Sequence, residues 1–143
     1  MEEENEGLFY RWVKEVWNEG KEATIDELFA EDGVADYPNY LENPTIYGKE
    51  EYKNFARFIH GLFTDIRVAV EQIASDKNKV IAYCTFNANR RGIVTKGVSV
   101  DSAISVSGLC QMIFENGVII RAWCNIDLFA VPEPIKNRIS ERV

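Results

Sequence analysis

The sequence VSGLCQMIFENGVIIRAWCNID, residues 106–127, decides the fold of this chain. Apolar and polar residues alternate on both sides of Glu-Asn-Gly, and Asn-Gly between alternating stretches is a strong signal for a β-hairpin. We therefore predict two antiparallel strands here, one over residues 98–114 and one over residues 118–127. Glycine inside a strand often marks a bulge, so we expect one at Gly108.

The second strand of this hairpin carries an unusual group of side chains. Alternation places Trp123, Asn125 and Asp127 on one face of the strand and Cys124 on the other. A two-residue Asn-Gly turn puts Cys110 opposite Trp123, whereas a three-residue Glu-Asn-Gly turn puts Cys110 on the same face as Cys124. Both registers stay open at this point, because a slip of one residue exchanges the two faces.

The first half of the chain has the pattern of three helices. Apolar residues recur at helical spacing over residues 8–17, and Asn5 in front of them is a residue type that caps helices. Thr24 and Glu27 have the spacing of a capping box, which predicts a second, short helix. A third helix is expected over about residues 49–63, where apolar side chains share one face.

Loops and two more strands complete the predicted fold. Gly, Pro and Asn in residues 31–44 predict a break in regular structure. Residues 66–71 and 80–87 alternate like strands, and residues 89–96, with three positive charges, resemble a hairpin loop. The predicted fold class is α+β, a single domain of residues 1–143 with about three N-terminal helices packed on a curved antiparallel sheet.

Composition excludes several classes of function. The formal net charge of −7 argues against nucleic acid and against an anionic membrane surface as partners. No apolar stretch is long enough to span a bilayer, and the acidic start MEEENEGLF does not resemble an export signal. Three cysteines without a CxxC pair, and a single histidine, predict reduced thiols in a cytoplasmic protein and no metal site.

Three stretches, in this order, resemble the SnoaL-like polyketide cyclases, a family also named ester cyclases. They are WNEG with IDELFAEDGVADYPN (residues 17–20 and 25–39), the segment from GKEEY to YCTF (residues 48–86), and the hairpin of residues 106–127. The resemblance implies the nuclear-transport-factor-2-like fold, a cone of helices and curved sheet around a deep pocket. It also implies an oligomer packed through the sheet and no metal or organic cofactor.

The resemblance indicates where catalytic groups would lie. In the cyclases an aspartate directly after the tryptophan of the last strand acts as acid and base in ring closure, and that position here is Cys124. Where many relatives have histidines, this chain has Asp36 and either Arg90 or Arg91. Asp36 and Asp127 are therefore the predicted catalytic bases, for proton transfer next to a carbonyl in an isomerisation, cyclisation or dehydration.

A pocket of this kind would hold a small apolar or polycyclic ligand. The predicted ligand-binding residues are Trp17, Tyr37, Tyr40, Phe55, His60, Gln111, Trp123, Cys124 and Asn125, and the aromatic residues Trp12, Tyr52 and Phe58 belong to the same group. Each also has a structural interpretation, as core residue, turn former or hydrogen-bonded boundary residue. Two functions stay open: a cofactor-independent enzyme, or a non-catalytic binding or assembly module. A homodimer fits both, with four residues expected to face outward: Ile104, Val106, Ile113 and Ile119.

Overall fold

The structure is a computed structural model that describes residues 2–40, 44–92, 94–95, 98–99 and 102–127. The helices are α1 (Glu2–Trp12), its continuation as a π-helix η1 (Val13–Asn18), α2 (Glu22–Leu28) and α3 (Gly48–Leu62). The strands are β1 (Phe29–Asp36), β2 (Thr45–Tyr47), β3 (Phe63–Asp76), β4 (Lys79–Arg90), β5 (Val94–Thr95), β6 (Val98–Ser99), β7 (Ser102–Glu115) and β8 (Val118–Asn125).

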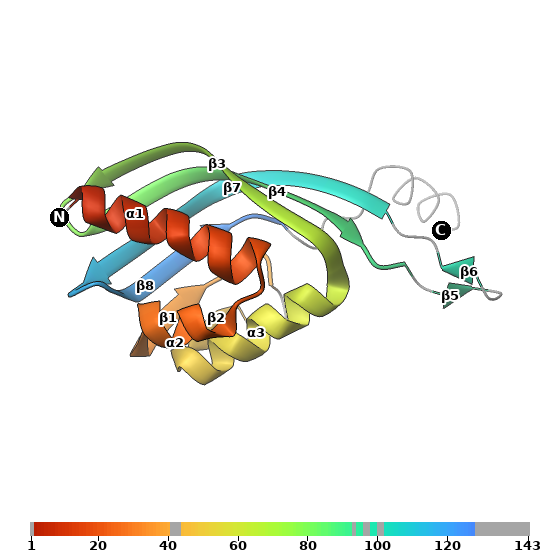
Figure 1. The fold of residues 1–143 in the computed structure, drawn as a ribbon, viewed down its shortest axis with the longest axis horizontal. Coiled ribbons are helices and arrows are strands. Elements are labelled where there is room, and N and C mark those ends of the chain that lie inside the picture. Colours follow the sequence, from red (N-terminus) through yellow and green to blue (C-terminus); the bar gives the residue numbers. More distant parts are fainter. Residues whose placement is uncertain (1, 41–43, 93, 96–97, 100–101, 128–143) are drawn as a thin grey trace.

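Six strands form one curved sheet in the order β2-β1-β8-β7-β4-β3. Neighbouring strands are antiparallel except β1 and β8, which are parallel. Figure 1 shows α1 lying across the concave face of this sheet, with α2 and α3 near β1 and β2. The predicted α+β fold of helices on a curved sheet is confirmed. Among the described helices, none combines the length and the apolar character that crossing a bilayer requires.

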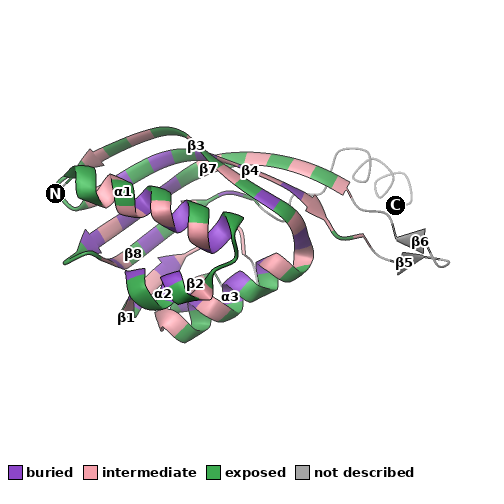
Figure 2. Ribbon diagram, in the orientation of Figure 1, coloured by how far each residue is buried: buried purple, intermediate pink, exposed green. Residues whose placement is uncertain are grey.

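The core lies between the helices and the concave face of the sheet. Buried residues alternate with more exposed ones along β4 and along the last part of β7 (Figure 2). This alternation is expected for strands that cover a core on one face only. Trp12, Phe29 and Tyr52 are among the largest fully buried side chains, and their rings contact one another at centroid distances of 5.0–6.0 Å. An aromatic cluster therefore joins α1 to α3 and β1.

Helix boundaries differ from the prediction in two places. Asn5 lies inside α1 and caps nothing, because the helix already begins at Glu2. Thr24 is not an N-cap either, because α2 begins at Glu22. The buried Thr24 hydroxyl instead donates to the Glu15 carboxylate at 2.6 Å, so this threonine fixes α2 against η1.

Several strand assignments also differ. The segment predicted as a break contains most of β1, where Gly33 leaves room for the ring of Phe29: a Cβ there would lie 2.7 Å from that ring. β4 continues to Arg90, so the start of the predicted 89–96 loop is strand, and Lys96 lies outside the described residues. Gly108 causes no bulge, since it pairs with Cys84 in a continuous ladder.

The turn of the closing hairpin has two residues. Glu115 pairs with Val118 around Asn116 and Gly117, whose φ angles of 51° and 80° are both positive. Positive φ at both central positions is typical of a type I′ turn, whose twist suits antiparallel strands. This turn alone would place Cys110 opposite Trp123.

A bulge behind the turn changes that register. Phe114 pairs with Ile119 but Ile113 pairs with Arg121, so Ile120 is an extra residue in β8. From there on the pairing is shifted by one residue and brings Cys110 opposite Cys124.

Of the four apolar residues predicted to face outward, Ile113 does lie on the convex face, between the buried Met112 and Phe114, but the other three do not. Ile119 is fully buried, and Ile104 and Val106 pack against the core from the concave face. The exposed apolar side chains on the convex face are Ile81, Tyr83, Leu109 and Trp123. The prediction failed for Ile104 and Val106 because alternation defines two faces without saying which of them is covered.

Candidate functional site

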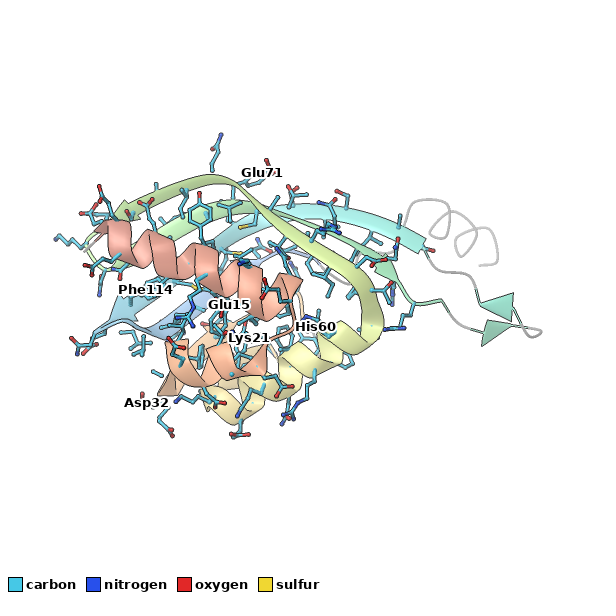
Figure 3. The ribbon with its side chains drawn as sticks, in the orientation of Figure 1. Glu15, Lys21, Asp32, His60, Glu71 and Phe114 are labelled. Carbon is cyan, nitrogen blue, oxygen red and sulfur yellow. The ribbon has the colours of Figure 1, made fainter. Side chains whose placement is uncertain are left out.

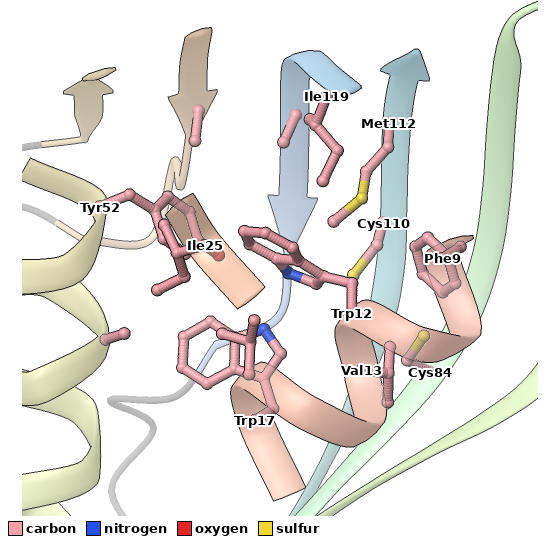
Figure 4. Packing of buried hydrophobic residues seen from close by; sticks show 14 of the residues in the cluster. Phe9, Trp12, Val13, Trp17, Ile25, Tyr52, Cys84, Cys110, Met112 and Ile119 are labelled. Carbon is pink, nitrogen blue, oxygen red and sulfur yellow. The ribbon is translucent and has the colours of Figure 1, made fainter. Parts of the chain in front are cut away.

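An apolar cavity lies between α1 with η1 and the concave face of the sheet. Phe9, Trp12 and Trp17 line it from the helices, and Cys84, Cys110 and Cys124 line it from β4, β7 and β8. Its volume is about 50 Å³. Figure 4 shows this packing, with Trp12 and Trp17 on one side and the sulfur atoms of Cys84, Cys110 and Met112 on the other.

A pair of tyrosines provides hydroxyl groups beside the cavity. Tyr37, which lines the cavity just after β1, and Tyr52 of α3 have hydroxyl oxygens 2.5 Å apart, and both side chains are buried. Burial raises the pKa of both phenols, and proximity to Cys124 raises it further. One hydroxyl hydrogen lies between the two oxygens, and the second hydroxyl hydrogen is available to another acceptor.

The indole of Trp12 supplies another donor. It is 1 % exposed and lines the cavity, and it interacts with the hydroxyl of Tyr52, a contact that lowers the pKa of that phenol against the larger, raising effect of burial, although Nε1 makes no hydrogen bond of good geometry within the described part of the chain. A buried donor without an acceptor costs about 1–3 kcal/mol, so such atoms are rare in folded proteins. A better aligned acceptor atom on a bound molecule would satisfy the Trp12 indole.

Three thiols form a row across the sheet. The Sγ atoms of Cys110 and Cys124 are 2.8 Å apart, and none of the three cysteines is in a disulfide. The hydrogen bond with Cys110, followed by burial, raises the pKa of the Cys84 thiol. The hydrogen bond with Cys124, together with burial, raises that of Cys110. Both of these thiols are therefore neutral near pH 7.

The predicted base Asp36 does not line the cavity. Its carboxylate accepts a hydrogen bond from Thr45 at 3.1 Å and forms an ion pair with Arg121 at 2.7 Å. Its neighbour Ala35 is fully buried, so alternation turns Asp36 to the convex face. Asp36 therefore joins the edge strand β2 to β8, and it is not among the described residues that line the cavity.

The polar residues of the last strand also lie on the convex side. Trp123 is 37 % exposed and pairs with Gln111 on that face, and it is also among the residues that line the cavity. Asn125 is exposed and its Oδ1 accepts a hydrogen bond from Asn39 at 2.7 Å. Asp127, the second predicted base, is exposed. Of the residues predicted as ligand-binding on this strand, the structure brings Trp123 and Cys124 to the cavity lining.

The remaining predicted residues divide between the core and the surface. Trp17 and Tyr37 line the cavity, whereas Phe55 packs behind Tyr37 at a ring distance of 4.5 Å. Tyr40 packs on Phe55 from outside. The nitrogens of His60 lie 2.8 Å and 3.0 Å from the carbonyl oxygens of Ala56 and Trp17, and its ring stacks on Trp17.

His60, labelled in Figure 3, thus ties the end of α3 to the end of η1, and within the described part of the chain it is not among the residues that line the cavity. The structural interpretation of this histidine, as a hydrogen-bonded boundary residue, fits this geometry. Cys84 and Met112 line the cavity and were not predicted to do so; their mid-strand positions and apolar neighbours gave no signal beyond that of core residues.

The polar atoms around the cavity share one chemical property: phenols, thiols and an indole are uncharged near pH 7. Among the described residues that line the cavity there is no carboxylate and no imidazole. Such a site donates hydrogen bonds to a neutral acceptor. It offers no described group that would take a proton from carbon at neutral pH.

A cone of helices and curved sheet around an inner cavity is the architecture of the ketosteroid isomerase-like proteins. The family model described as SnoaL-like polyketide cyclase matches residues 7–133, and the chain belongs to this family. The predicted family is thereby confirmed. A comparison with curated proteins finds no match.

Solved structures share the fold at low sequence identity. A protein of a Jannaschia species, described as a SnoaL-like polyketide cyclase, is 18% identical over 89% of this chain and 88% of its own, with a TM-score of 0.75. IdmH of Streptomyces antibioticus, described as a polyketide cyclase, is 21% identical over 86% of this chain and 91% of its own, with a TM-score of 0.74. A ketosteroid isomerase-like protein of Catenulispora acidiphila, in complex with trimethylamine, is 14% identical over 85% of both chains, with a TM-score of 0.70.

Proposed function

We propose that this chain binds a small, uncharged, largely apolar molecule in the cavity, and that it is a binding protein rather than a cyclase. The observation that carries the proposal is the uncharged lining: Tyr37, Cys110 and Cys124 supply its polar atoms where the cyclases use a carboxylate. A cyclase mechanism needs a base close to the reacting carbon. Here Asp36 is engaged by Arg121 on the other side of the sheet.

The size of the cavity limits the ligand. A cavity needs about 10–15 Å³ to hold one water molecule. The cavity of about 50 Å³ therefore holds a group of only a few non-hydrogen atoms. A polycyclic ligand, as expected from the sequence, needs a pocket of about 300 Å³ or more. We therefore infer a ligand with a single small ring or a short chain.

The free donors define the ligand further. The Trp12 indole is held only by a poorly aligned contact with Tyr52, and the second tyrosine hydroxyl hydrogen is available, so both can donate to a ligand that carries a carbonyl, ether or hydroxyl oxygen. Its remaining surface is apolar, to match Phe9, Val13 and Met112 in the wall. Because the site is uncharged, a carboxylate or ammonium group would be bound poorly.

Calorimetry or NMR titration with matched probes tests this proposal. We expect cyclopentanone to bind about two- to tenfold more tightly than cyclopentane, since one hydrogen bond contributes about 0.5–1.5 kcal/mol. The Tyr37→Phe variant should reduce this ratio by weakening the ketone only. The fused-ring ketone tetralone should not bind. Preferential binding of tetralone, or equal binding of both five-membered rings, would contradict the proposal.

A second candidate is proton transfer next to a carbonyl, the enzymatic function predicted from the sequence. It is favoured by the short contact between Tyr37 and Tyr52, because paired phenols can stabilise a developing enolate oxygen. Proton NMR in D₂O distinguishes the candidates: an enzyme accelerates deuterium exchange at the carbon next to the ketone. If exchange is catalysed, its loss in Asp36→Asn or Asp127→Asn would identify the base.

We also propose that the chain forms a homodimer through the convex face. Ile81, Tyr83, Leu109 and Trp123 are 37–48 % exposed there. They lie on three adjacent strands, β4, β7 and β8, so they form one continuous apolar patch. Patches of this kind on sheets mark interaction surfaces, and a two-fold axis would bury the patch against its own copy.

A further inference from the structure

Two thiols at the cavity are positioned for a reaction that the proposed function does not use. Cys110 and Cys124 are direct cross-strand partners with free thiol groups, and their Sγ atoms are 2.8 Å apart. We propose that they form a dithiol site, which a hydroperoxide oxidises to an intramolecular disulfide. The bulge at Ile120 creates this pair, because without it Cys110 would lie opposite Trp123.

The backbone geometry suits the bond. Directly opposed residues of antiparallel strands have Cα atoms about 4.5 or 5.5 Å apart, within the 4.4–6.8 Å range of disulfides. The sulfur atoms must approach by less than about 1 Å to reach the bonded distance of about 2.05 Å. Rotation of the two side chains is enough for this, and the strands need not move.

The surroundings decide which thiol reacts first. Cys124 is half-buried, whereas Cys110 and Cys84 are buried. A small oxidant therefore reaches Cys124 most easily. The hydrogen bond with Cys124 and burial raise the pKa of Cys110, which disfavours its thiolate as the first nucleophile.

The reaction has two balanced steps. The Cys124 thiolate attacks one peroxide oxygen of ROOH: an S–O bond forms, the O–O bond breaks, and the alcohol ROH leaves with the thiol proton. The Cys110 sulfur then attacks the resulting sulfenic acid, so that the S–S bond forms and the S–O bond breaks. The hydroxide that leaves takes up the proton of the Cys110 thiol and becomes water. The two thiols lose two electrons, and the hydroperoxide gains them.

Cys84 is the natural internal control. It belongs to the same row of thiols and also interacts with Cys110, but its direct cross-strand partner in β7 is Gly108. Cys110 is therefore only a diagonal neighbour of Cys84 on the adjacent strand. We expect Cys84 to stay reduced while the other two pair.

Peptide mapping tests the proposal directly. Trypsin separates the three cysteines into residues 80–90, 97–121 and 122–136, because it cleaves after Lys79, Arg90, Lys96, Arg121 and Lys136. The folded chain is treated with one equivalent of hydrogen peroxide, alkylated and digested without reductant. We expect one cross-linked species joining residues 97–121 to 122–136, an alkylated Cys84, and release of both peptides by reductant.

Variants test the order of events. Cys84→Ser should give the same cross-link at the same rate, whereas Cys110→Ser should leave a Cys124 sulfenic acid that dimedone traps on peptide 122–136. The proposal is overturned if the wild-type map contains no such cross-link, if peptide 80–90 is joined instead, or if the cross-links are between chains. Because the map uses the wild-type chain, it decides the question even where a variant fails to fold.

Discussion

The contact between Tyr37 and Tyr52 permits a quantitative test of the cavity chemistry. Removing either hydroxyl leaves the other one buried without its partner, which costs about 1–3 kcal/mol. Replacing both by phenylalanine keeps the packing and removes both donors, which is nearly neutral for stability. We therefore expect Tyr37→Phe and Tyr52→Phe each to lower the free energy of unfolding by about 1–3 kcal/mol, and the double variant to lower it by less than either.

Urea denaturation followed by far-UV circular dichroism measures these values, since the aromatic substitutions would disturb fluorescence. The slope of free energy against urea should stay constant, which shows that the folded and unfolded states are otherwise unchanged. Tyr47→Phe is the matched control: this ring is 62 % exposed, and its substitution should change stability by less than about 0.5 kcal/mol. Additive effects of the two buried substitutions, without a coupling of at least about 1 kcal/mol, would refute the reasoning.

Three further predictions concern the scaffold. Gly108→Ala should lower the free energy of unfolding by about 1–3 kcal/mol or more, because a Cβ there would lie 1.9 Å from the Asn125 carbonyl oxygen. Gly61→Ala in α3, where a Cβ would meet nothing within 4 Å, should raise the free energy of unfolding by about 0.5–1 kcal/mol. If urea denaturation shows that the two glycine substitutions change this free energy in the same direction, the account is contradicted. Hydrogen bonds from Thr24 and Arg11 lower the pKa of Glu15 from 4.5 to about 2, so this stabilisation is complete above pH 4.5 and is lost as the pH falls toward 2. Thr24→Val should flatten that acid dependence in thermal melts, and an unchanged dependence would disprove the assignment. Leu109→Asp should convert the dimer to monomer in sedimentation velocity, whereas Tyr10→Asp, equally exposed at 48 %, should leave it dimeric; a monomeric wild-type chain would rule the dimer out.

The fold could be predicted from the sequence where a pattern extends over many residues. The apolar face of α3 and the closing hairpin are long, periodic segments, and both are present. β1 escaped prediction because its Gly33 resembles a turn former in isolation. In the folded chain, that glycine is required by the ring of Phe29. Local sequence does not contain this distant packing requirement.

The candidate site was less predictable than the fold. The resemblance to the cyclases pointed to Cys124 as the position of their aspartate, and in the structure Cys124 lines the cavity. Asp36 was predicted as a base because the sequence cannot show its partner Arg121, which is 85 residues further along the chain. The pairing of Tyr37 with Tyr52 likewise depends on how α3 is placed against β1. Charge and hydrogen-bond partners are properties of the tertiary structure, and they decide what an acidic residue does.

The extra residue in β8 has a consequence for how homologous chains are compared. Ile120 sets the side of the sheet that every later residue of the strand faces. Deletion of this one residue would exchange the two faces, so that the Trp123 side chain pointed to the concave side of the sheet and the Cys124 side chain to the convex side. In an alignment that places the gap one position away, a cavity residue of one homologue is matched to a surface residue of another. Transfer of a catalytic role along this strand should therefore count residues from the bulge rather than from Trp123.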